Sequence, residues 1–258
     1  MAKPSLSEDY VTLRFYAELG DFLPEENRGR GFSQKLPAGA TVKHVIEAAG
    51  VPHTEVELIL RNGESVGFDE RPKPGDRLSV YPVFESLDVA PLVRVREKPL
   101  RKTRFVLDVH LGKLALILRL LGFDALFPGD VPDAELAGIS AGTGRILLTR
   151  DIGLLKRSAV THGCYIRSHD PAEQAEEVLD RLDLRGRVEP FRRCARCGGE
   201  LEDVDKAEII HRLEPLTKRY YDEFRVCTEC GRIYWKGSHY PALRQLLEDL
   251  GVDGGDAD

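Results

Sequence analysis

Two short apolar runs decide the fold of this chain: FVL at residues 105–107 and ILL at residues 146–148. Each run stops near an aspartate, Asp108 after the first and Asp151 after the second. Apolar strands that end this way are typical of a parallel sheet, in which ligands sit at the carboxyl ends of the strands. Carboxylates gathered on that rim would make a site for a hard divalent cation.

Strand and helix alternate from residue 105 to about residue 184. We expect helices at residues 113–121, 133–143, 153–158 and 171–182, and a further strand at residues 164–167. Pro132 stands at the start of the second helix, and Asp170 is well placed to cap the last one. This alternation predicts a three-layer α/β unit.

Length and composition limit the number of domains and the kinds of partner that the chain can have. A chain of 258 residues indicates two or three domains, and its net charge of -6 argues against a wholesale nucleic-acid coat. No apolar run is long enough to span a bilayer, so we expect no membrane partner. The first residues lack the apolar segment of a signal peptide. We therefore expect a cytoplasmic protein.

Residues 8–85 form a first unit. Alternating apolar residues predict a strand at residues 11–16 with a hairpin partner at 31–36, a helix at 42–49 capped by Thr41, and strands at 56–60 and 77–83. This order resembles the β-grasp fold of ubiquitin-like and sulfur-carrier proteins, as does KPGDRL at residues 73–78. A sulfur carrier acts through a terminal Gly-Gly, but three residues follow Gly255 here, so a polar tail is the simpler interpretation. We expect a binding or scaffolding module.

A basic linker at residues 86–104 separates the first unit from the second. Between residues 93 and 104 its cations are Arg94, Arg96, Lys98, Arg101, Lys102 and Arg104, opposed in that shorter stretch by Glu97. Such a run is commonly a solvated connector. Its position just before the strand that ends at Asp108 favours a strip that follows a phosphate backbone.

Carboxylates are the residues of the second unit that could carry chemistry. The candidates are Asp108, Asp133 or Glu135, Asp151 and Asp170. Hydrolysing a phosphodiester requires charge neutralisation on the phosphate and a deprotonated water, which carboxylate-bound Mg²⁺ or Mn²⁺ supplies. Aspartates after strands are also common as helix caps and turn formers, so spacing alone leaves both interpretations open.

Two C-x-x-C pairs are the strongest signal in the chain. Cys194 with Cys197, and Cys227 with Cys230, predict a tetrahedral thiolate site for structural Zn²⁺, and a glycine after each pair permits the tight turn. The gap between the pairs is long, so we expect an inserted segment at residues 204–221. Cys164 lies in an apolar strand and is expected to be an inert core residue.

These motifs together resemble the Mut-seven C-terminal RNase domain family. The resemblance rests on FVLD at 105–108, LGKLA at 111–115, LRLLGFD at 118–124 and LLTRD at 147–151. It implies a nuclease related to the PIN domains, a C-terminal zinc ribbon and, in bacterial members, a ubiquitin-like domain in front. It covers nearly the whole chain.

The resemblance also assigns roles to individual residues. Asp108 matches the first acidic position and Asp151 the aspartate of the Thr-Arg-Asp motif. Asp133 lies where the family has an acidic pair, with Glu135 as a substitute, and Asp170 corresponds least securely to a fourth carboxylate. One departure is His110, because the family has a small or apolar pair after the first aspartate.

Four side chains are candidates for contacts with RNA: Lys113, Arg150, Lys236 and His239. Lys113 follows the first aspartate at a helix start, and Arg150 could hold phosphate or form a structural ion pair. Arg119 is a further cation that could pair with Asp124. Trp235 is expected to pack the ribbon, although stacking on unpaired bases is the alternative.

The leading hypothesis is a metal-dependent ribonuclease of mixed α/β class. It has a ubiquitin-like β-grasp domain at 8–85, the linker at 86–104, a PIN-like domain with a parallel sheet at 105–186, and a zinc ribbon with a C-terminal helix at 187–250. Asp108, Asp133 and Asp151 would hold Mg²⁺ or Mn²⁺, RNA is the expected partner, and the first domain would bind a protein. The alternative is a non-catalytic RNA-binding or adaptor protein.

Overall fold

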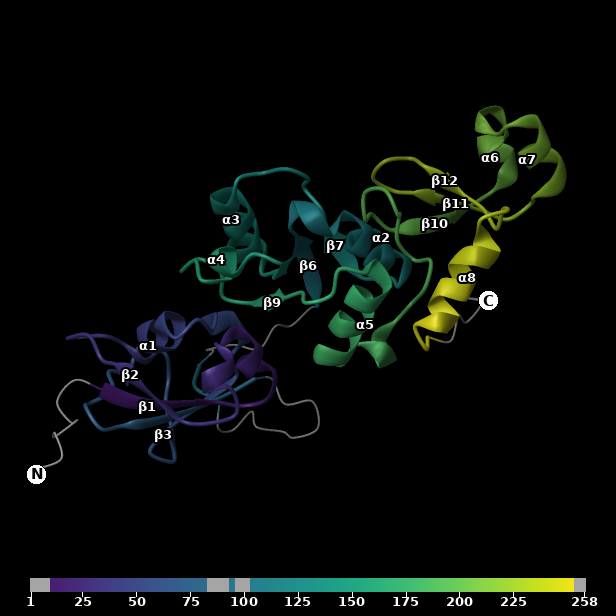
Figure 1. The fold of residues 1–258 in the computed structure, drawn as a ribbon. Coiled ribbons are helices and arrows are strands. Elements are labelled where there is room, and N and C mark those ends of the chain that lie inside the picture. Colours follow the sequence, from purple (N-terminus) through teal and green to yellow (C-terminus); the bar gives the residue numbers. More distant parts are fainter. Residues whose placement is uncertain (1–9, 83–92, 96–102, 253–258) are drawn as a thin grey trace, which may run out of the picture.

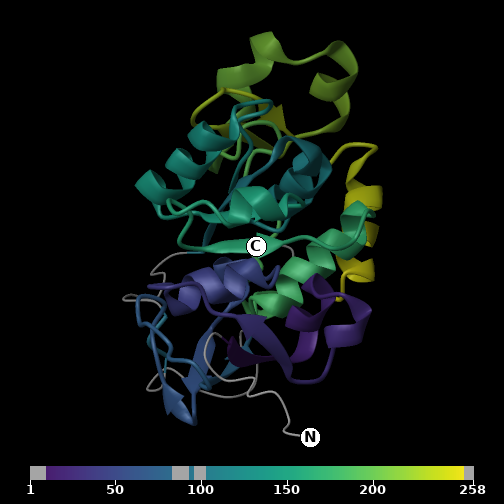
Figure 2. The same cartoon turned by 60° about the vertical axis from the view of Figure 1, so that its left-hand side comes forward.

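A computed structural model describes residues 10–82, 93–95 and 103–252. Figure 1 shows three successive units, each built around its own sheet. Turned by 60°, the N-terminal unit lies below the central one, and most of the C-terminal unit lies above it (Figure 2). Within the described residues, no helix is both long enough and apolar enough to cross a bilayer.

The N-terminal unit is a five-stranded sheet with one α-helix. The strand order is β2-β1-β5-β3-β4, with β1 and β5 parallel and the other pairs antiparallel. The elements are β1 (Tyr10–Phe15), β2 (Phe32–Lys35), α1 (Val42–Ala48), β3 (Leu58–Arg61), β4 (Glu64–Ser65) and β5 (Arg77–Tyr81). This is the predicted β-grasp arrangement, and the hydroxyl of Thr41 caps α1 as expected, accepting from the N–H of His44 at 3.3 Å. The Gly254-Gly255 tail lies outside the described residues.

The central unit is a parallel sheet in the order β7-β6-β8-β9. Its strands are β6 (Arg104–Leu107), β7 (Asp124–Leu126), β8 (Ile146–Thr149) and β9 (Gly163–Tyr165). Its helices are α2 (Gly112–Leu120), α3 (Asp133–Thr143), α4 (Ile152–Leu155) and α5 (Pro171–Arg181). Asp170 caps α5 as predicted, accepting from the N–H groups of Ala172 and Glu173 at 2.9 and 3.2 Å.

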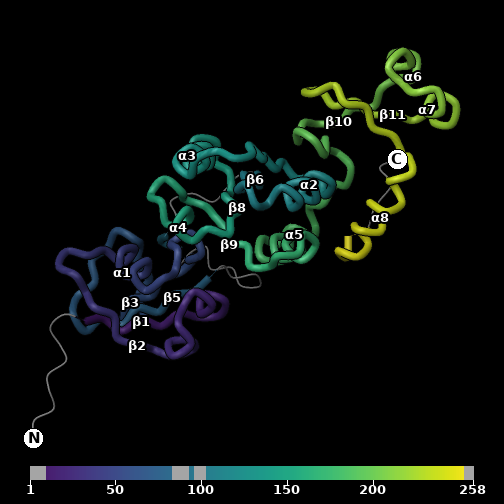
Figure 3. Tube along the Cα trace, turned by 45° about the horizontal axis from the view of Figure 1, so that its top comes forward, coloured from purple at the N-terminus to yellow at the C-terminus, as the bar shows by residue number. Residues whose placement is uncertain are grey.

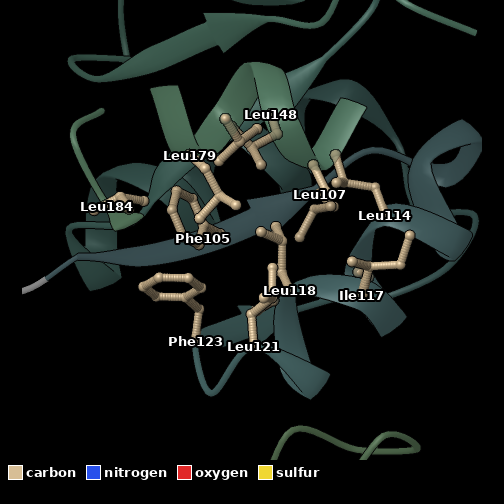
Figure 4. Close-up of a cluster of buried hydrophobic side chains, with 14 of the residues drawn as sticks. Phe105, Leu107, Leu114, Ile117, Leu118, Leu121, Phe123, Leu148, Leu179 and Leu184 are labelled. Atoms are coloured by element: carbon tan, nitrogen blue, oxygen red, sulfur yellow. The ribbon is translucent and has the colours of Figure 1, made fainter. Parts of the chain in front are cut away.

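Both faces of this sheet are covered, because alternate residues of a strand point to opposite sides. Phe105, Leu107 and Leu148 pack with α2 and α5 in one buried cluster (Figure 4). Val106 and Leu147 pack with α3 and α4 in another. The predicted three-layer α/β unit is therefore confirmed.

The strand β7 was not predicted from the sequence. It has only three residues, Asp124 to Leu126, so no alternation reveals it. Tertiary contacts hold it: it pairs with β6, and the Asp124 carboxylate accepts two hydrogen bonds from Arg145, at 2.7 and 3.0 Å. The expected pairing of Asp124 with Arg119 is replaced by this one. The helix predicted at residues 153–158 is also shorter, because α4 ends at Leu155.

The C-terminal unit is a small antiparallel sheet of β10 (Leu201–Val204), β11 (Phe224–Cys227) and β12 (Ile233–Tyr234). The segment between the two cysteine pairs contains α6 (Lys206–Ile209) and α7 (Pro215–Tyr220), which accounts for the long gap. The last helix, α8 (Tyr240–Asp249), returns to the central unit. It lies beside α5 (Figure 2). Leu247 of α8 and Leu250, just after its end, belong to the same buried cluster as Leu179 of α5.

The N-terminal unit docks on the edge strand β9 of the central sheet (Figures 1 and 3). The short 3₁₀ turn His53–Glu55 makes the contact. Glu55 is fully buried there: it accepts the backbone N–H of Tyr165 at 2.5 Å and forms an ion pair with Arg181. His53 contacts the carbonyl of Val160 at 2.8 Å. A residue that appears solvent-facing in the sequence is thus the centre of an interdomain contact.

Replacing Glu55 with alanine should lower the free energy of unfolding by about 3 kcal/mol, because the Tyr165 N–H would lose its acceptor and the half-buried Arg181 its closest carboxylate. Urea denaturation monitored by circular dichroism measures this loss. Glu189→Ala is the matched control, since its ion pair with Arg192 is more than half exposed and should contribute about 0.5 kcal/mol or less. Equal losses in the two variants would contradict the structural role of Glu55.

Candidate metal centres

The strand order of the central sheet reverses between β6 and β8. From β6 the chain moves outward to β7, then crosses back beyond β6 to β8 and β9. In open α/β sheets, ligands bind outside the carboxyl ends of the strands at such a point. Asp108 follows β6 directly and Asp151 lies two residues after the end of β8, so both aspartates border this position.

Thr149 joins the two aspartates. Its hydroxyl, fully buried, donates to Oδ2 of Asp108 at 2.7 Å and accepts from the backbone N–H of Asp151 at 2.9 Å. Oδ1 of Asp108 also accepts from the N–H of Val109 at 2.6 Å. Thr149 thus links the carboxylate of Asp108 to the backbone of Asp151, a role that the sequence reasoning did not single out. The Asp151 carboxylate itself caps α4, where its Oδ1 accepts from the N–H groups of Gly153 and Leu154 at 2.6 and 3.3 Å.

Replacing Thr149 with valine should destabilise the protein by about 1–3 kcal/mol, because the Asp151 N–H loses its acceptor and Asp108 loses a donor at a buried position. Thr149→Ser keeps the hydroxyl and should cost less. Paired urea denaturation curves distinguish the two. Equal stability of the valine variant and the parent would show that this hydrogen-bonded link is dispensable.

The other predicted carboxylates lie on the same rim but do not form one cluster with Asp108 and Asp151. Asp133, at the start of α3, pairs with Arg157 at 3.3 Å, and Glu135 is exposed on the same helix. Asp170 is engaged as the cap of α5. No three carboxylates in the described part of the chain bring their oxygens within 4.8 Å of one another. The rim as described thus presents two aspartates linked through Thr149 and three further acidic positions.

Arg150 forms hydrogen bonds to backbone carbonyl groups. Its guanidinium donates to the carbonyls of Ile166 and Arg167, at 3.1 and 2.6 Å, and also to that of Ser168. It therefore fixes the loop that leads to Asp170, a role that neither sequence interpretation of Arg150 foresaw. Lys113 is exposed in the first turn of α2, and His110 is exposed beside it. Of the predicted basic linker, residues 86–92 and 96–102 lie outside the described residues.

The four predicted cysteines converge. Their Sγ atoms all lie within 4.8 Å of one another, with Cys194 3.6 Å from Cys230 and Cys197 3.4 Å from Cys227. Four thiolates at tetrahedral Zn–S distances would be roughly 3.8 Å apart, so the cluster could hold a metal ion such as zinc. Cys164 is buried in the central core, away from this cluster, and burial raises its pKa to about 12.

Local backbone geometry shapes the cysteine site. The glycine after each pair has a positive φ, +86° at Gly198 and +67° at Gly231, which closes each turn as predicted. The hydroxyl of Tyr234 lies 3.0 Å from Sγ of Cys194. Burial by itself raises the pKa of Cys194. Hydrogen bonds from Tyr234 and from backbone N–H groups have the larger combined effect and lower the pKa to about 6. A thiolate is therefore favoured at this position.

Arg119 ties the first cysteine turn to the central unit. This buried side chain of α2 donates to the carbonyl of Ala125 on β7 at 2.8 Å and to that of Arg196 at 2.8 Å. Burial lowers the pKa of Arg119, and the thiols of Cys197 and Cys194 act in the opposite direction. The cysteine site is thus fixed against the outer edge of the parallel sheet.

Comparisons with known proteins match this organisation. The family model described as Mut7-C RNAse domain matches residues 103–247, and the one described as Mut7-C ubiquitin matches residues 8–88. No curated protein matches the chain. Among solved structures, small archaeal modifier protein 1 of H. volcanii is similar, with 20% identity over 30% of this chain and 99% of that chain, at a TM-score of 0.24. The RNase match covers more than half of the sequence, and so the chain belongs to the Mut7-C RNAse domain family, with a Mut7-C ubiquitin domain before it.

Proposed function

We propose that this protein is a metal-dependent ribonuclease that hydrolyses RNA phosphodiester bonds at the rim of the central sheet. The observation that carries the proposal is the pair Asp108 and Asp151, joined through Thr149 where the strand order reverses. Membership in a family of RNase domains supports the reaction class. Asp133 is the third proposed carboxylate, with Glu135 and Asp170 as further acidic positions at the rim.

The donor chemistry of this rim fits a hard divalent cation. Carboxylate oxygens are the ligands that Mg²⁺ and Mn²⁺ prefer, and a bound ion would neutralise phosphate charge and lower the pKa of a water molecule. Asp108 and Asp151 would hold the ion, while Thr149 fixes the orientation of Asp108. Lys113, exposed on the first turn of α2, would contact phosphate next to the scissile bond. The water oxygen would bond to phosphorus as the ester oxygen leaves with a proton.

The zinc assignment belongs to the same proposal. The cysteine cluster would hold a structural Zn²⁺, because four thiolate ligands leave no open position for a substrate. Lys236 and His239, exposed next to β12, are proposed contacts to the RNA backbone. The N-terminal domain would bind a protein partner through surface other than residues 53–55, which contact the central unit.

The test is cleavage of a labelled single-stranded RNA in buffers with and without Mn²⁺. Omitting Mn²⁺ is preferable to adding a strong chelator, since a chelator would also remove zinc. We expect cutting only when Mn²⁺ is present, together with saturable Mn²⁺ binding in titration calorimetry. Unchanged cutting without added Mg²⁺ or Mn²⁺ would overturn the proposal.

A specific observation favours a second candidate, a non-catalytic RNA-binding or adaptor protein. Asp133 is paired with Arg157, and no three carboxylates of the described residues gather within 4.8 Å. In that case the protein would bind RNA and show neither Mn²⁺ binding heat nor cleavage. The same pair of measurements therefore separates the two candidates.

A further inference from the structure

A cavity of about 580 Å³ lies between the small antiparallel sheet and the start of α8. Its volume is in the range of cavities that hold small organic ligands. Aromatic side chains from separate segments of the C-terminal unit line it: Phe191, Tyr221, Phe224, Tyr234, Trp235 and Tyr240. We call this cavity the aromatic pocket. It lies outside the acidic rim described above.

The ring of Trp235 is only partly covered by its aromatic neighbours in the pocket. Trp235 is 42% exposed, although Tyr221 and Phe224 lie with their ring centroids 6.4 Å from it. Phe191 and Tyr240 form a tilted pair at 5.0 Å on another side of the same cavity. An indole that is partly packed and partly open combines the two interpretations of Trp235: it supports the ribbon and can still stack on a planar ligand.

Positive groups stand beside these rings. Lys236 places its Nζ atom 6.0 Å from the Tyr240 ring centroid, and its partner Glu223, at 3.5 Å, is largely exposed. Arg225 also lines the pocket and pairs with Asp203. The first turn of α8 begins at the pocket with His239 and Tyr240, which adds the positive end of a helix dipole. Glu223 and Asp203, the partners of these two cations, line the pocket as well, and both are largely exposed, so a phosphate would take their place beside Lys236 and Arg225. Aromatic rings with such replaceable ion pairs match a base attached to a phosphate.

We propose that the aromatic pocket binds one unpaired base of a single-stranded RNA, stacked on Trp235, with the adjoining phosphate next to Lys236 and the first turn of α8. The inference rests on the proposed ribonuclease function and adds the form of its substrate. The helix α2 runs from Gly112, near the acidic rim, to Leu120 at the pocket, about 12 Å along its axis. The RNA is therefore anchored at a distance from the bond that is cut.

The first experiment uses the fluorescence of Trp235, which is the single tryptophan of the chain. The probe is a single-stranded hexanucleotide of adenosine, titrated into the full-length zinc-loaded protein without Mg²⁺ or Mn²⁺. Stacking should quench the emission saturably, whereas a fully paired RNA duplex of similar length should not. Absence of quenching by the single strand overturns the proposal and leaves a protein partner as the remaining occupant.

The second experiment compares two aromatic deletions by fluorescence anisotropy of a labelled hexanucleotide. Trp235→Ala should weaken binding by about tenfold or more, the size expected for one stacked base. Tyr220→Ala is the matched control: Tyr220 is 63% exposed, lies near the pocket and does not line it, so binding should change less than twofold. Equal binding by the two variants contradicts the proposal.

Trp235→Phe keeps an aromatic face and should recover most of the affinity lost in the alanine variant. Zinc content and melting temperature, measured for each variant, show whether that variant is folded. If Trp235→Ala fails to fold, the quenching measured with the parent protein decides the question. Since all binding is measured without the catalytic cation, failure of the pocket leaves the proposed cleavage untouched. Conversely, RNA binding at Trp235 without any cleavage would refute only the ribonuclease function.

Discussion

Replacing Asp108 with asparagine should abolish Mn²⁺-dependent cleavage of RNA, with a loss of at least about a thousandfold. Asparagine has nearly the same shape and can still accept a hydrogen bond from Thr149, so the rim should keep its geometry. The negative charge that would hold the proposed cation is removed, and a loss of about 4 kcal/mol in transition-state stabilisation corresponds to this factor. Initial rates of RNA cutting at saturating Mn²⁺ measure the effect.

The control for this experiment is Asp180→Asn. Asp180 lies near the end of α5, where it pairs with Arg185, away from the carboxyl ends of the strands. This variant should cleave RNA at the rate of the parent. RNA affinity measured without Mn²⁺ should also be unchanged in Asp108→Asn. If Asp108→Asn cuts as fast as the parent, the proposed active site is wrong.

Replacing Cys194 with serine should unfold the C-terminal unit. Zinc binding contributes about 10–16 kcal/mol to folding in zinc-finger peptides, which exceeds what three short strands can provide without the ion. The tryptophan emission should shift to longer wavelength as the packing of Trp235 on Phe224 and Tyr221 is lost. Bound zinc, measured by a chromogenic chelator after denaturation, should fall from one ion per chain to nearly none.

Cys164→Ala provides the matched control, because Cys164 is a buried cysteine outside the cluster. It should retain zinc and native emission. The parent protein treated with a strong chelator should behave like Cys194→Ser. A zinc-free protein with native tryptophan emission would contradict the structural role of the ion.

The sequence was most informative where local pattern and tertiary structure agree. The strands around Phe105 and Leu147, the cap at Asp170 and the paired cysteines were predicted because each depends on neighbouring residues. Thr149 escaped notice, although it stands two residues before Asp151, because a hydroxyl in a strand carries no signal of its own. Its role depends on Asp108, which lies 41 residues earlier.

Other features depend on contacts between segments that are distant in the sequence and could not be predicted from it. Glu55 resembles any surface glutamate until Arg181 and the N–H of Tyr165 meet it from a different domain. The strand β7 is too short for periodicity and is defined by its pairing with β6. The aromatic pocket combines rings from segments that span residues 191–240, so no single motif marks it.

The central sheet has two outer strands, and each is covered by a different neighbour. Glu55 satisfies an amide of β9, and Arg119, linked to the first cysteine turn, satisfies a carbonyl of β7. A trimmed version comprising only the central unit would lose Glu55 and leave this amide of β9 unpaired, whereas Arg119 would keep its bond to β7 and lose only its contact with the cysteine turn. Such a border is a template for intermolecular strand pairing, so fragments of this kind should self-associate and precipitate. The central unit therefore depends on the N-terminal unit to cover its β9 edge.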